Sequence, residues 1–517
     1  MIPPVRPLVQ LRRPVTSHRL PAIFALLVSC AFILSACDDD VVGPGNGSDA
    51  DDSTPGVTAV VVSPAQLELH VGTQEALSAE VQGSNGVSQS VTWESSDTQV
   101  ASVNSSGQVS AVGLGTATIT ATSQADASAS GQATVEVVCP DPIAVTGHIN
   151  SDETWTGEGV GCIDYVVADM YEVRATLTIE PGTAVAFQQD AGLILEAGGA
   201  VVADGTQADP ILLTGTEQVR GWWGGIDIRR SERQENLFNH VTIEYGGQDD
   251  PFNQYDPGFA LKVGGPAAAS GTQDTSQRFA TITNTTLRGS AGYGLFIRAN
   301  AQVHFAGNTL TDNALGAARM PLHVTGVLDE ASDFSGNDVE IIMLTHYAAG
   351  DVELVHPGQG VRYRMGRPGN DPTRARISAQ GTLTIAPGTI LEFTERSDLT
   401  IPESGTLISE GTDSEPVVFT GLEGTEGFWG GITLDGSSGN SIRYTTVEYG
   451  GHFAGANVGV ESGASATITD SILRYAGTNQ FGSYGYGLRV TASSSVNADA
   501  CEVNTFVGNA AGDCLIG

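Results

Sequence analysis

The sequence predicts an all-β protein, built as a β-sandwich followed by a longer stack of short strands. Apolar and polar residues alternate along most of the chain, and beyond the amino terminus no apolar helical pattern is sustained for more than about two turns. Glycine accounts for 65 of 517 residues, whereas aromatic residues make up only 6%. Because glycine tolerates the backbone angles of tight turns, this composition suits many short strands.

An internal repeat supports the same class. A segment of 50 residues begins at Leu177 and occurs again from Leu383, and the two agree at 20 positions without a gap. Each is followed by a second shared phrase that ends in EYGG. Such self-similarity is typical of stacked repeat architectures, in which each unit covers the core of its neighbour. We expect one copy over residues 139–335 and a second over 336–517.

Residues 1–37 have the features of a bacterial export signal. Four arginines precede an apolar run of 15 residues, which is short for a membrane span. The run closes with LSAC, ending at Cys37, and this resembles the lipobox of bacterial lipoproteins. The resemblance implies lipidation of Cys37 and a protein anchored to a membrane of the cell envelope, in the periplasm or at the cell surface. The alternative is an ordinary secretory signal.

Two stretches follow the export signal. Residues 38–55 are acidic and rich in Gly, Ser and Pro, which predicts a disordered tether. Residues 56–138 show short alternating strands at the spacing of a β-sandwich. The phrases VTWESS, GQVSA and GTATITA resemble the bacterial immunoglobulin-like domain of group 2. That family implies a spacer or adhesion module without chemistry of its own, and Trp93 is expected in its core.

The repeated region contains apolar strands of three to five residues, punctuated by Gly, Asn or Asp. The phrases LTIEPGT, PILLTG and WWGGI resemble those of extracellular repeat proteins that have the right-handed parallel β-helix of the pectate lyase-like group. A β-propeller is the alternative fold, although blades of about 40 to 50 residues would give more than two copies.

Several polar and aromatic residues recur at equivalent positions of the two copies. Recurrence on a duplicated scaffold favours a structural role, so Glu244 and Glu448 are expected in a shared turn, each followed by a tyrosine. Trp223 and Trp429 are expected to pack inside the stack. The recurring arginines are expected to pair with acidic neighbours, and they are Arg288 and Arg474.

Four cysteines lie in the exported chain beyond the lipobox. Cys139 and Cys162 are 23 residues apart, and Cys501 and Cys514 are 13 residues apart. In an oxidising compartment these spacings suggest two disulfides that brace the two ends of the stack. Metal binding is the alternative, but neither a CxxC motif nor clustered histidines support it.

The net charge of −36 argues against nucleic acid as a partner, because phosphate binding requires Lys and Arg. One acidic loop follows the first EYGG phrase and is absent from the second copy. It is a candidate site for calcium or sugar, or else an ordinary surface loop, and its candidate ligand residues are Asp249, Asp250, Tyr255 and Asp256.

Together these patterns predict an exported, lipid-anchored cell-envelope protein. We expect it to present its β-helix for adhesion or glycan binding, to a polysaccharide or another surface protein. No cofactor is expected apart from calcium at the acidic loop. The alternative function is an extracellular polysaccharide lyase or glycoside hydrolase, but the sequence shows no recognisable carboxylate pair for such catalysis.

Overall fold

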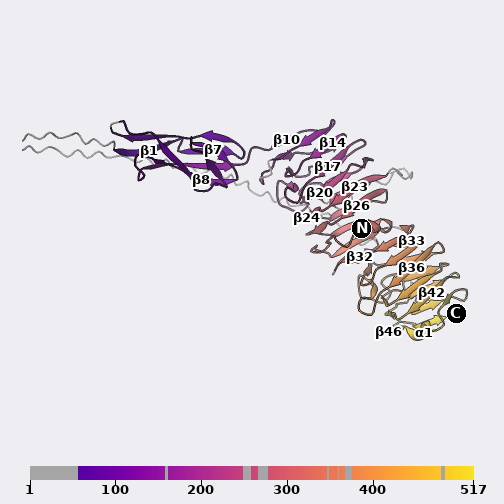
Figure 1. Ribbon diagram of the computed structural model, residues 1–517. Coiled ribbons are helices and arrows are strands. Elements are labelled where there is room, and N and C mark those ends of the chain that lie inside the picture. Colours follow the sequence, from indigo (N-terminus) through magenta and orange to yellow (C-terminus); the bar gives the residue numbers. More distant parts are fainter. Residues whose placement is uncertain are drawn as a thin grey trace, which may run out of the picture. The chain divides into compact units, whose positions relative to one another are not determined.

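The computed structural model describes residues 56–84, 86–157, 161–248, 258–265, 277–345, 348–358, 360–366, 375–478, 482 and 484–517 (Figure 1). These residues form strands almost throughout. The short helices η1 and α1 are the helical elements among them, and they span Leu322–Val327 and Ala500–Val503.

The first folded unit consists of nine short strands in three small sheets. Most neighbouring strands are antiparallel, and alternate residues point into one core that contains Val109, Ile119 and Val135. Trp93 is half-buried and packs against this core, as the sequence predicts. The strands are β1 (Val57–Ser63), β2 (Gln66–His70), β3 (Gln74–Ala76), β4 (Ser78–Gly83), β5 (Val91–Ser95), β6 (Ala101–Val103), β7 (Gln108–Ala111), β8 (Gly115–Ser123) and β9 (Ser130–Val138).

The remaining strands form a coil with three faces in its first half. Two faces are a seven-stranded and a six-stranded sheet. The seven-stranded sheet contains β10 (Ile143–Val145), β12 (Tyr165–Val167), β15 (Ala184–Phe187), β18 (Ile211–Gly215), β21 (Val241–Glu244), β24 (Thr286–Arg288) and β27 (Thr309–Thr311). The six-stranded sheet contains β11 (Glu153–Trp155), β14 (Thr176–Ile179), β17 (Ala200–Asp204), β20 (Leu237–Asn239), β23 (Arg278–Thr283) and β26 (Ala301–Ala306).

The third face is a sheet of 13 strands that continues through both halves of the coil. It contains β13 (Met170–Val173), β16 (Gly192–Leu195), β19 (Ile226–Ile228), β22 (Phe259–Val263), β25 (Tyr293–Ile297), β28 (Gly316–Pro321), β29 (Ile341–Thr345), β32 (Arg362–Met365), β34 (Ile390–Phe393), β37 (Val417–Gly421), β40 (Thr445–Glu448), β43 (Ile472–Arg474) and β46 (Thr505–Val507).

In the second half the other two faces are joined into one sheet of 12 strands by β33, whose 11 residues pair with β35 at one end and with β36 at the other. This sheet contains β30 (Ala348–Ala349), β31 (Val352–Leu354), β33 (Ala375–Ile385), β35 (Ser397–Pro402), β36 (Gly405–Glu410), β38 (Ile432–Asp435), β39 (Asn440–Arg443), β41 (Ala456–Glu461), β42 (Ser465–Thr469), β44 (Tyr486–Val490), β45 (Ser495–Val496) and β47 (Gly512–Ile516).

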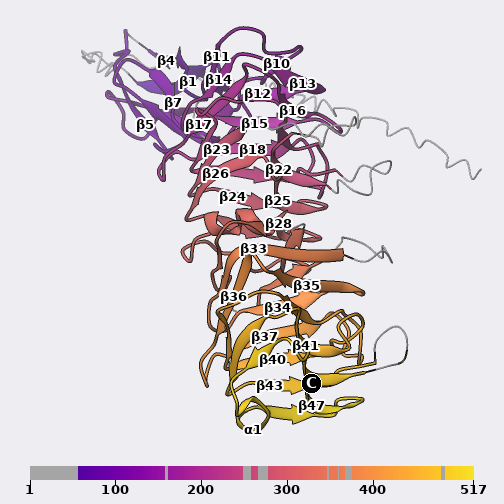
Figure 2. The same cartoon turned by 90° about the vertical axis from the view of Figure 1, so that its right-hand side faces the viewer.

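The strand pairing identifies the coil as a parallel β-helix. Among the described residues, every pair of neighbouring strands from β10 onward is parallel, and from β11 to β25 each strand pairs with the strand three places later in the chain. Figure 2 shows the resulting rungs stacked one above another. The β-propeller alternative is wrong, because propellers belong to the antiparallel architectures.

Inward side chains form rows along the coil, because the parallel register places equivalent residues on neighbouring rungs. Aromatic residues stack on one another within these rows. Trp223 stacks on Phe187 and Trp429 stacks on Phe393, each pair with ring centroids 4.0 Å apart. Both tryptophans are fully buried. The sequence prediction that they pack inside is confirmed.

The chain turns sharply at equivalent points of the two copies. His240 and Tyr444 have φ angles of 49° and 44°, in the left-handed region, and each separates two strands that lie on adjacent faces. Tyr245 and Tyr449, which follow the recurring glutamates, both have φ 62°. Left-handed backbone in non-glycine residues is uncommon, so its recurrence confirms the shared turn.

The second copy is turned by one face relative to the first. β16 and β35 hold equivalent sequences, yet β16 lies in the thirteen-stranded sheet and β35 in the twelve-stranded one. The thirteen-stranded sheet instead continues with β34, the equivalent of β15. Between β28 and β34 this sheet also contains β29 and β32. The expected boundary at 335/336 falls between its neighbouring strands β28 and β29.

Both ends of the coil carry a disulfide. Cys139 is bonded to Cys162, and Cys501 is bonded to Cys514. The first closes the loop that contains β10 and β11, and the second joins α1 to β47, the last strand of its sheet. These pairs agree with the spacing in the sequence.

Candidate functional site

A row of outward side chains runs across the thirteen-stranded sheet. Within each strand these residues alternate with residues of the core, because successive side chains point to opposite faces. The register places them side by side on neighbouring strands, at a spacing of about 4.8 Å. We call this set the outer row, and it comprises Asp227, Lys262, Phe296, Arg319, Met343, Arg364 and Glu392.

Carboxylates at both ends of the outer row compensate its positive charges. At one end, Lys262 Nζ lies 3.3 Å from Asp227 Oδ2, and both side chains are buried. At the other end, the buried Glu392 accepts hydrogen bonds from Arg364 Nε at 2.7 Å and from Arg362 Nη1 at 3.1 Å. Removing one partner of such a pair leaves an uncompensated buried charge, so these contacts hold the row in one arrangement.

Near the middle of the outer row, an aromatic ring lies close to two guanidinium groups. The central carbons of the Arg319 and Arg298 guanidinium groups lie 4.8 Å and 5.1 Å from the centroid of the Phe296 ring. Burial raises the pKa of the nearby Tyr293 hydroxyl, while the positive charges of Arg319 and Arg364 oppose that rise. Aromatic rings pack against apolar ligand faces, and guanidinium groups donate hydrogen bonds in a fixed fork.

The acidic loop predicted as a ligand site is attached to the same sheet. The chain reaches this loop after Gly247 and returns at Gly258, immediately before the strand that carries Lys262. A Cβ atom on Gly258 would lie 1.9 Å from the Gly247 carbonyl oxygen, so the two ends of the loop meet. The candidate residues themselves lie outside the described residues, and they are Asp249, Asp250, Tyr255 and Asp256.

The recurring glutamates and arginines bond to each other. Glu244 accepts a hydrogen bond from Arg288 Nε at 2.7 Å, and Glu448 accepts one from Arg474 Nε at 2.6 Å. A threonine bonds to the other oxygen of each carboxylate, at 2.9 Å and 2.8 Å. We call each set a brace, and the two braces comprise Thr214, Glu244 and Arg288, and Thr420, Glu448 and Arg474.

Each brace is also tied to the core. Trp223 Nε1 donates to the Glu244 carbonyl oxygen at 2.8 Å, and Trp429 Nε1 donates to the Glu448 carbonyl oxygen at 2.8 Å. The same contacts therefore occur twice, with the same geometry. This agrees with the structural role that recurrence predicts, and it sets these glutamates apart from the residues that occur once.

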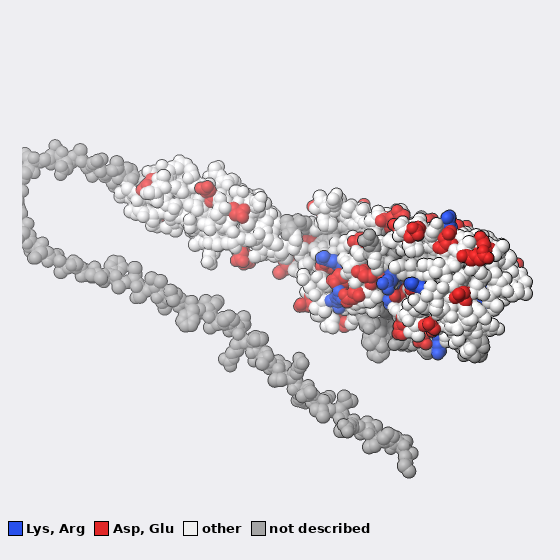
Figure 3. Space-filling model, turned by 90° about the horizontal axis from the view of Figure 1, so that it is seen from below, with Lys and Arg blue, Asp and Glu red and all other residues white. Residues whose placement is uncertain are grey.

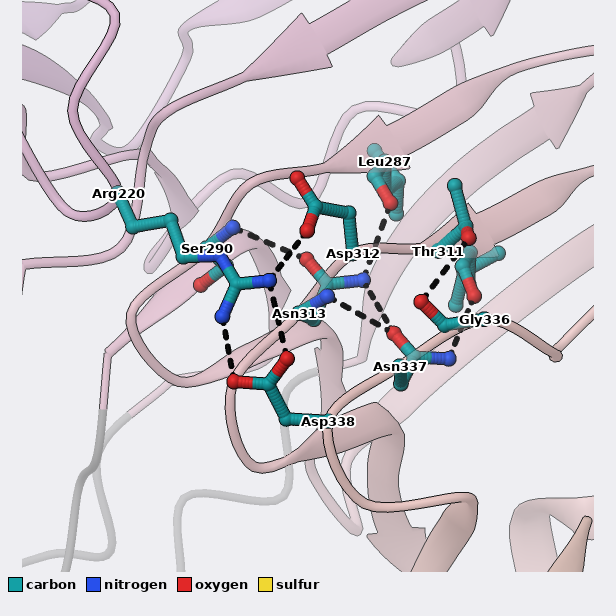
Figure 4. A network of polar contacts seen from close by, with 10 residues as sticks. Arg220, Leu287, Ser290, Thr311, Asp312, Asn313, Gly336, Asn337 and Asp338 are labelled. Atoms are coloured by element: carbon teal, nitrogen blue, oxygen red, sulfur yellow. Dashed lines mark hydrogen bonds and ion pairs between the residues drawn. The ribbon is translucent and has the colours of Figure 1, made fainter.

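A polar network that the sequence did not reveal joins turns of the first copy to residues just beyond its expected end at residue 335 (Figure 4). Arg220 donates to both oxygens of Asp338 and forms an ion pair with Asp312. These contacts raise the pKa of Arg220, and the hydrogen bond from Arg220 lowers the pKa of the Asp338 carboxyl. Beside them, Asn313 Nδ2 donates to the Asn337 side-chain oxygen at 3.0 Å. The network therefore joins the turns just beyond β27, the last strand of the seven-stranded sheet.

Two further observations concern the described residues. Within the described ranges, no group of three His, Cys, Asp or Glu side chains is placed to hold a metal ion. The same part of the chain contains no helix that is long and apolar enough to cross a membrane.

The comparison with known families concerns the first folded unit. Residues 56–137 match the family model of the bacterial Ig-like domain, group 2. This stretch is a bacterial Ig-like domain. The resemblance of its VTWESS, GQVSA and GTATITA phrases is therefore confirmed. No curated protein matches the chain.

The Ig-like domain carries no Lys or Arg in its sequence, so every positive side chain beyond residue 55 belongs to residues 139–517. In Figure 3 the charged side chains that are visible on the Ig-like domain are all acidic. On the β-helix, Lys and Arg lie among acidic side chains. A bacterial Ig-like domain and two disulfides suggest an extracellular or envelope protein.

Proposed function

We propose that this protein is an exported, lipid-anchored component of the bacterial cell envelope that binds a polysaccharide on its β-helix without cleaving it. Lipidation at Cys37 would hold the chain at a membrane. The acidic tether and the Ig-like domain would then act as spacers, and the β-helix would carry the binding surface.

The observation that carries this proposal is the outer row. It combines guanidinium groups with an aromatic ring in one regular row, in which Phe296 and Arg319 are each 7% exposed. Polysaccharides also present polar groups and apolar ring faces at regular intervals. Its least buried cation is Arg364, whose side chain is 21% exposed. Arg362, which also bonds to Glu392, has a side chain that is 49% exposed. The polymer would first meet the row at this end. The proposed calcium or sugar ligands Asp249, Asp250, Tyr255 and Asp256 belong to a loop attached next to the other end.

The test is to incubate the exported chain, residues 38–517, with acidic and neutral polysaccharides, with and without calcium. We expect retention on at least one polymer and no release of reducing or unsaturated ends. Arg364→Gln should weaken retention about tenfold, the worth of one hydrogen bond to a charged group. Arg288→Gln is the matched control, because Arg288 also pairs with a buried glutamate but belongs to a brace.

Three outcomes would contradict the proposal. Absence of retention on every polymer would exclude polysaccharide binding of this kind. Equal retention by the wild type and by Arg364→Gln would exclude the outer row. Release of new ends would make the protein a lyase or hydrolase. If calcium strengthens retention, the Asp249→Ala/Asp250→Ala double variant should lose that effect, and an unchanged calcium response would exclude the loop as the calcium site.

A further inference from the structure

A second surface feature lies on a different face of the β-helix from the outer row. It is an open hollow of about 400 Å³ over β23 and β26, two neighbouring strands of the six-stranded sheet. Its volume lies within the range of about 300 to 1,000 Å³ that is typical of small-molecule sites. The side chains that line it belong to Gln234, Phe279, Thr281, Gln302 and His304.

The register of the two strands fixes how these side chains lie. Phe279 pairs with Gln302, and Thr281 pairs with His304. All four alternate with core residues, so they point outward as a square on adjacent strands. A hydrogen bond from Asn236 Nδ2 to the Phe279 carbonyl oxygen, 3.0 Å long, holds the backbone at one corner. The half-buried Phe279 ring is therefore placed among an exposed amide, a hydroxyl and an imidazole.

This combination suits one sugar ring. A pyranose has an apolar face of C–H groups and a rim of hydroxyl groups. The apolar face can pack on an aromatic ring, and the hydroxyl groups can exchange hydrogen bonds with amide, hydroxyl and imidazole groups, which all both donate and accept. Gln234 supplies a second amide at the edge of the hollow.

The charges around the hollow favour a neutral sugar. None of the described side chains that line it belongs to Lys or Arg. Arg233 and Glu235 flank Gln234 in the chain, and they form an ion pair with each other at 3.1 Å, while the nearby Glu232 lies 3.7 Å from Arg278. The chain carries a net charge of −36. The lining therefore offers no cation to a uronic acid carboxylate, and the overall negative charge of the chain disfavours an anionic ligand.

We propose that this hollow binds a neutral pyranose unit of a glycan and stacks it on Phe279. The inference shares with the proposed function only the assumption that the ligand is a glycan, because the hollow and the outer row lie on different sheets. In the second copy Ser465 stands in the place of Phe279, while Thr467 is the equivalent of Thr281. The stacking platform therefore belongs to the first copy.

The experiment uses the full chain in a detergent that lacks a sugar headgroup. Neutral gluco-, galacto- and manno-configured tetrasaccharides and matching uronate tetrasaccharides are titrated, and dissociation constants are obtained from saturation-transfer NMR. We expect at least one neutral tetrasaccharide to bind and the uronates to bind at least about tenfold more weakly. Phe279→Ala should weaken binding of the neutral ligand about tenfold or more, because truncating a central aromatic contact has effects of that size.

The controls separate stacking from folding. Phe279→Tyr keeps an aromatic face and should retain binding, so a loss in Phe279→Ala alone is a loss of stacking. Thr281→Ala should weaken binding, while Thr467→Ala, at the equivalent position of the second copy, should not. Circular dichroism melting curves confirm that each variant folds.

Failure of this inference differs from failure of the proposed function. Failure of every neutral tetrasaccharide to bind, unchanged binding by Phe279→Ala, or tighter binding of a uronate would each overturn the hollow as a neutral-sugar site. None of these results involves Arg364. If polymer retention depends on Arg364 while Phe279→Ala binds normally, the outer row stands and the hollow does not. If binding of the neutral ligand depends on Phe279 while polymer retention does not depend on Arg364, the hollow stands and the outer row does not.

Discussion

Individual residues of this β-helix divide into those that recur in both copies and those that occur once. Glu244 and Glu448 make the same bonds to arginine, threonine and tryptophan in each copy. The two glutamates precede the same left-handed turn in each copy, at Tyr245 and Tyr449, which explains why their contacts recur. Phe279 occurs once, where the second copy has serine. A residue that occurs once, such as Phe279, is therefore a better candidate for ligand binding than one that recurs.

The brace makes a residue-level prediction. Glu244→Gln and Glu448→Gln should each lower the free energy of unfolding by about 1 to 2 kcal/mol, since each removes a hydrogen bond to a charged group whose arginine partner is partly exposed. The midpoints of urea unfolding measure the effect. The two losses should be similar because the contacts are equivalent.

Glu217→Gln and Glu423→Gln are matched controls for the brace. They occupy equivalent positions of the two copies, and both residues are exposed. They should leave the midpoints unchanged. A loss in one copy only, or an equal loss in the controls, would show that the brace is not a shared structural element.

The sequence anticipated some residue roles and missed others. Trp223 and Trp429 lie inside the coil, as their place between a turn and an apolar strand predicts. Arg220 gave no such signal. Its partners Asp312 and Asp338 are 92 and 118 residues away in the chain, and only the stacking of turns brings them together.

At the scale of elements, the turn residues determine where each strand ends. The left-handed residues His240 and Tyr444 redirect the chain from one face to the next within a single residue. Each coil turn is therefore short and regular, and its strands align with those of the next turn. The two disulfides act at the places where this alignment stops.

The disulfides make the element-level prediction. Loop-closure entropy for loops of 23 and 13 residues gives each about 3 kcal/mol of stabilisation. Because each rung contacts only its neighbours, the effect of losing a bond should be local. The Cys139→Ser/Cys162→Ser variant should exchange amide hydrogens faster at β10 to β12. The Cys501→Ser/Cys514→Ser variant should do so at β46 and β47.

Hydrogen exchange measured by mass spectrometry checks this directly. Strands β34 and β37, which lie in neither disulfide loop, serve as the internal control within each variant and should exchange as in the wild type. Faster exchange throughout the coil would contradict local bracing. Unchanged exchange at both ends would show that the disulfides do not secure the end rungs.

The whole molecule combines modules with different charge. The Ig-like domain is acidic and lacks Lys and Arg, whereas the β-helix carries all the positive side chains beyond residue 55. If the Ig-like domain is a spacer, as proposed, this composition disfavours polyanionic partners and would leave binding to the β-helix. This difference in charge between the two modules fits the proposed function, in which the Ig-like domain separates the binding surface from the lipid anchor.

The anchor makes the whole-molecule prediction. If Cys37 is lipidated, the wild type should fractionate with membranes, because each buried CH₂ of the acyl chains adds about 0.8 kcal/mol. Cys37→Ser should move the protein to the soluble fraction, measured by immunoblotting. Cys30→Ser is the matched control, since Cys30 lies within the apolar run but outside the lipobox. Membrane retention of Cys37→Ser would exclude a lipid anchor at this residue.

The sequence by itself determined the all-β class, the Ig-like domain, the repeated coil and the pairing of the cysteines. These properties can be read along the chain itself, from alternation along a strand, the placement of turn residues and the recurrence of the same phrases. Only the tertiary structure decided that the second copy is turned by one face, that Arg220 meets Asp312 and Asp338, and that Phe279 lies beside Gln302 and His304. Each of these depends on the register between strands that are many residues apart, which local patterns do not encode.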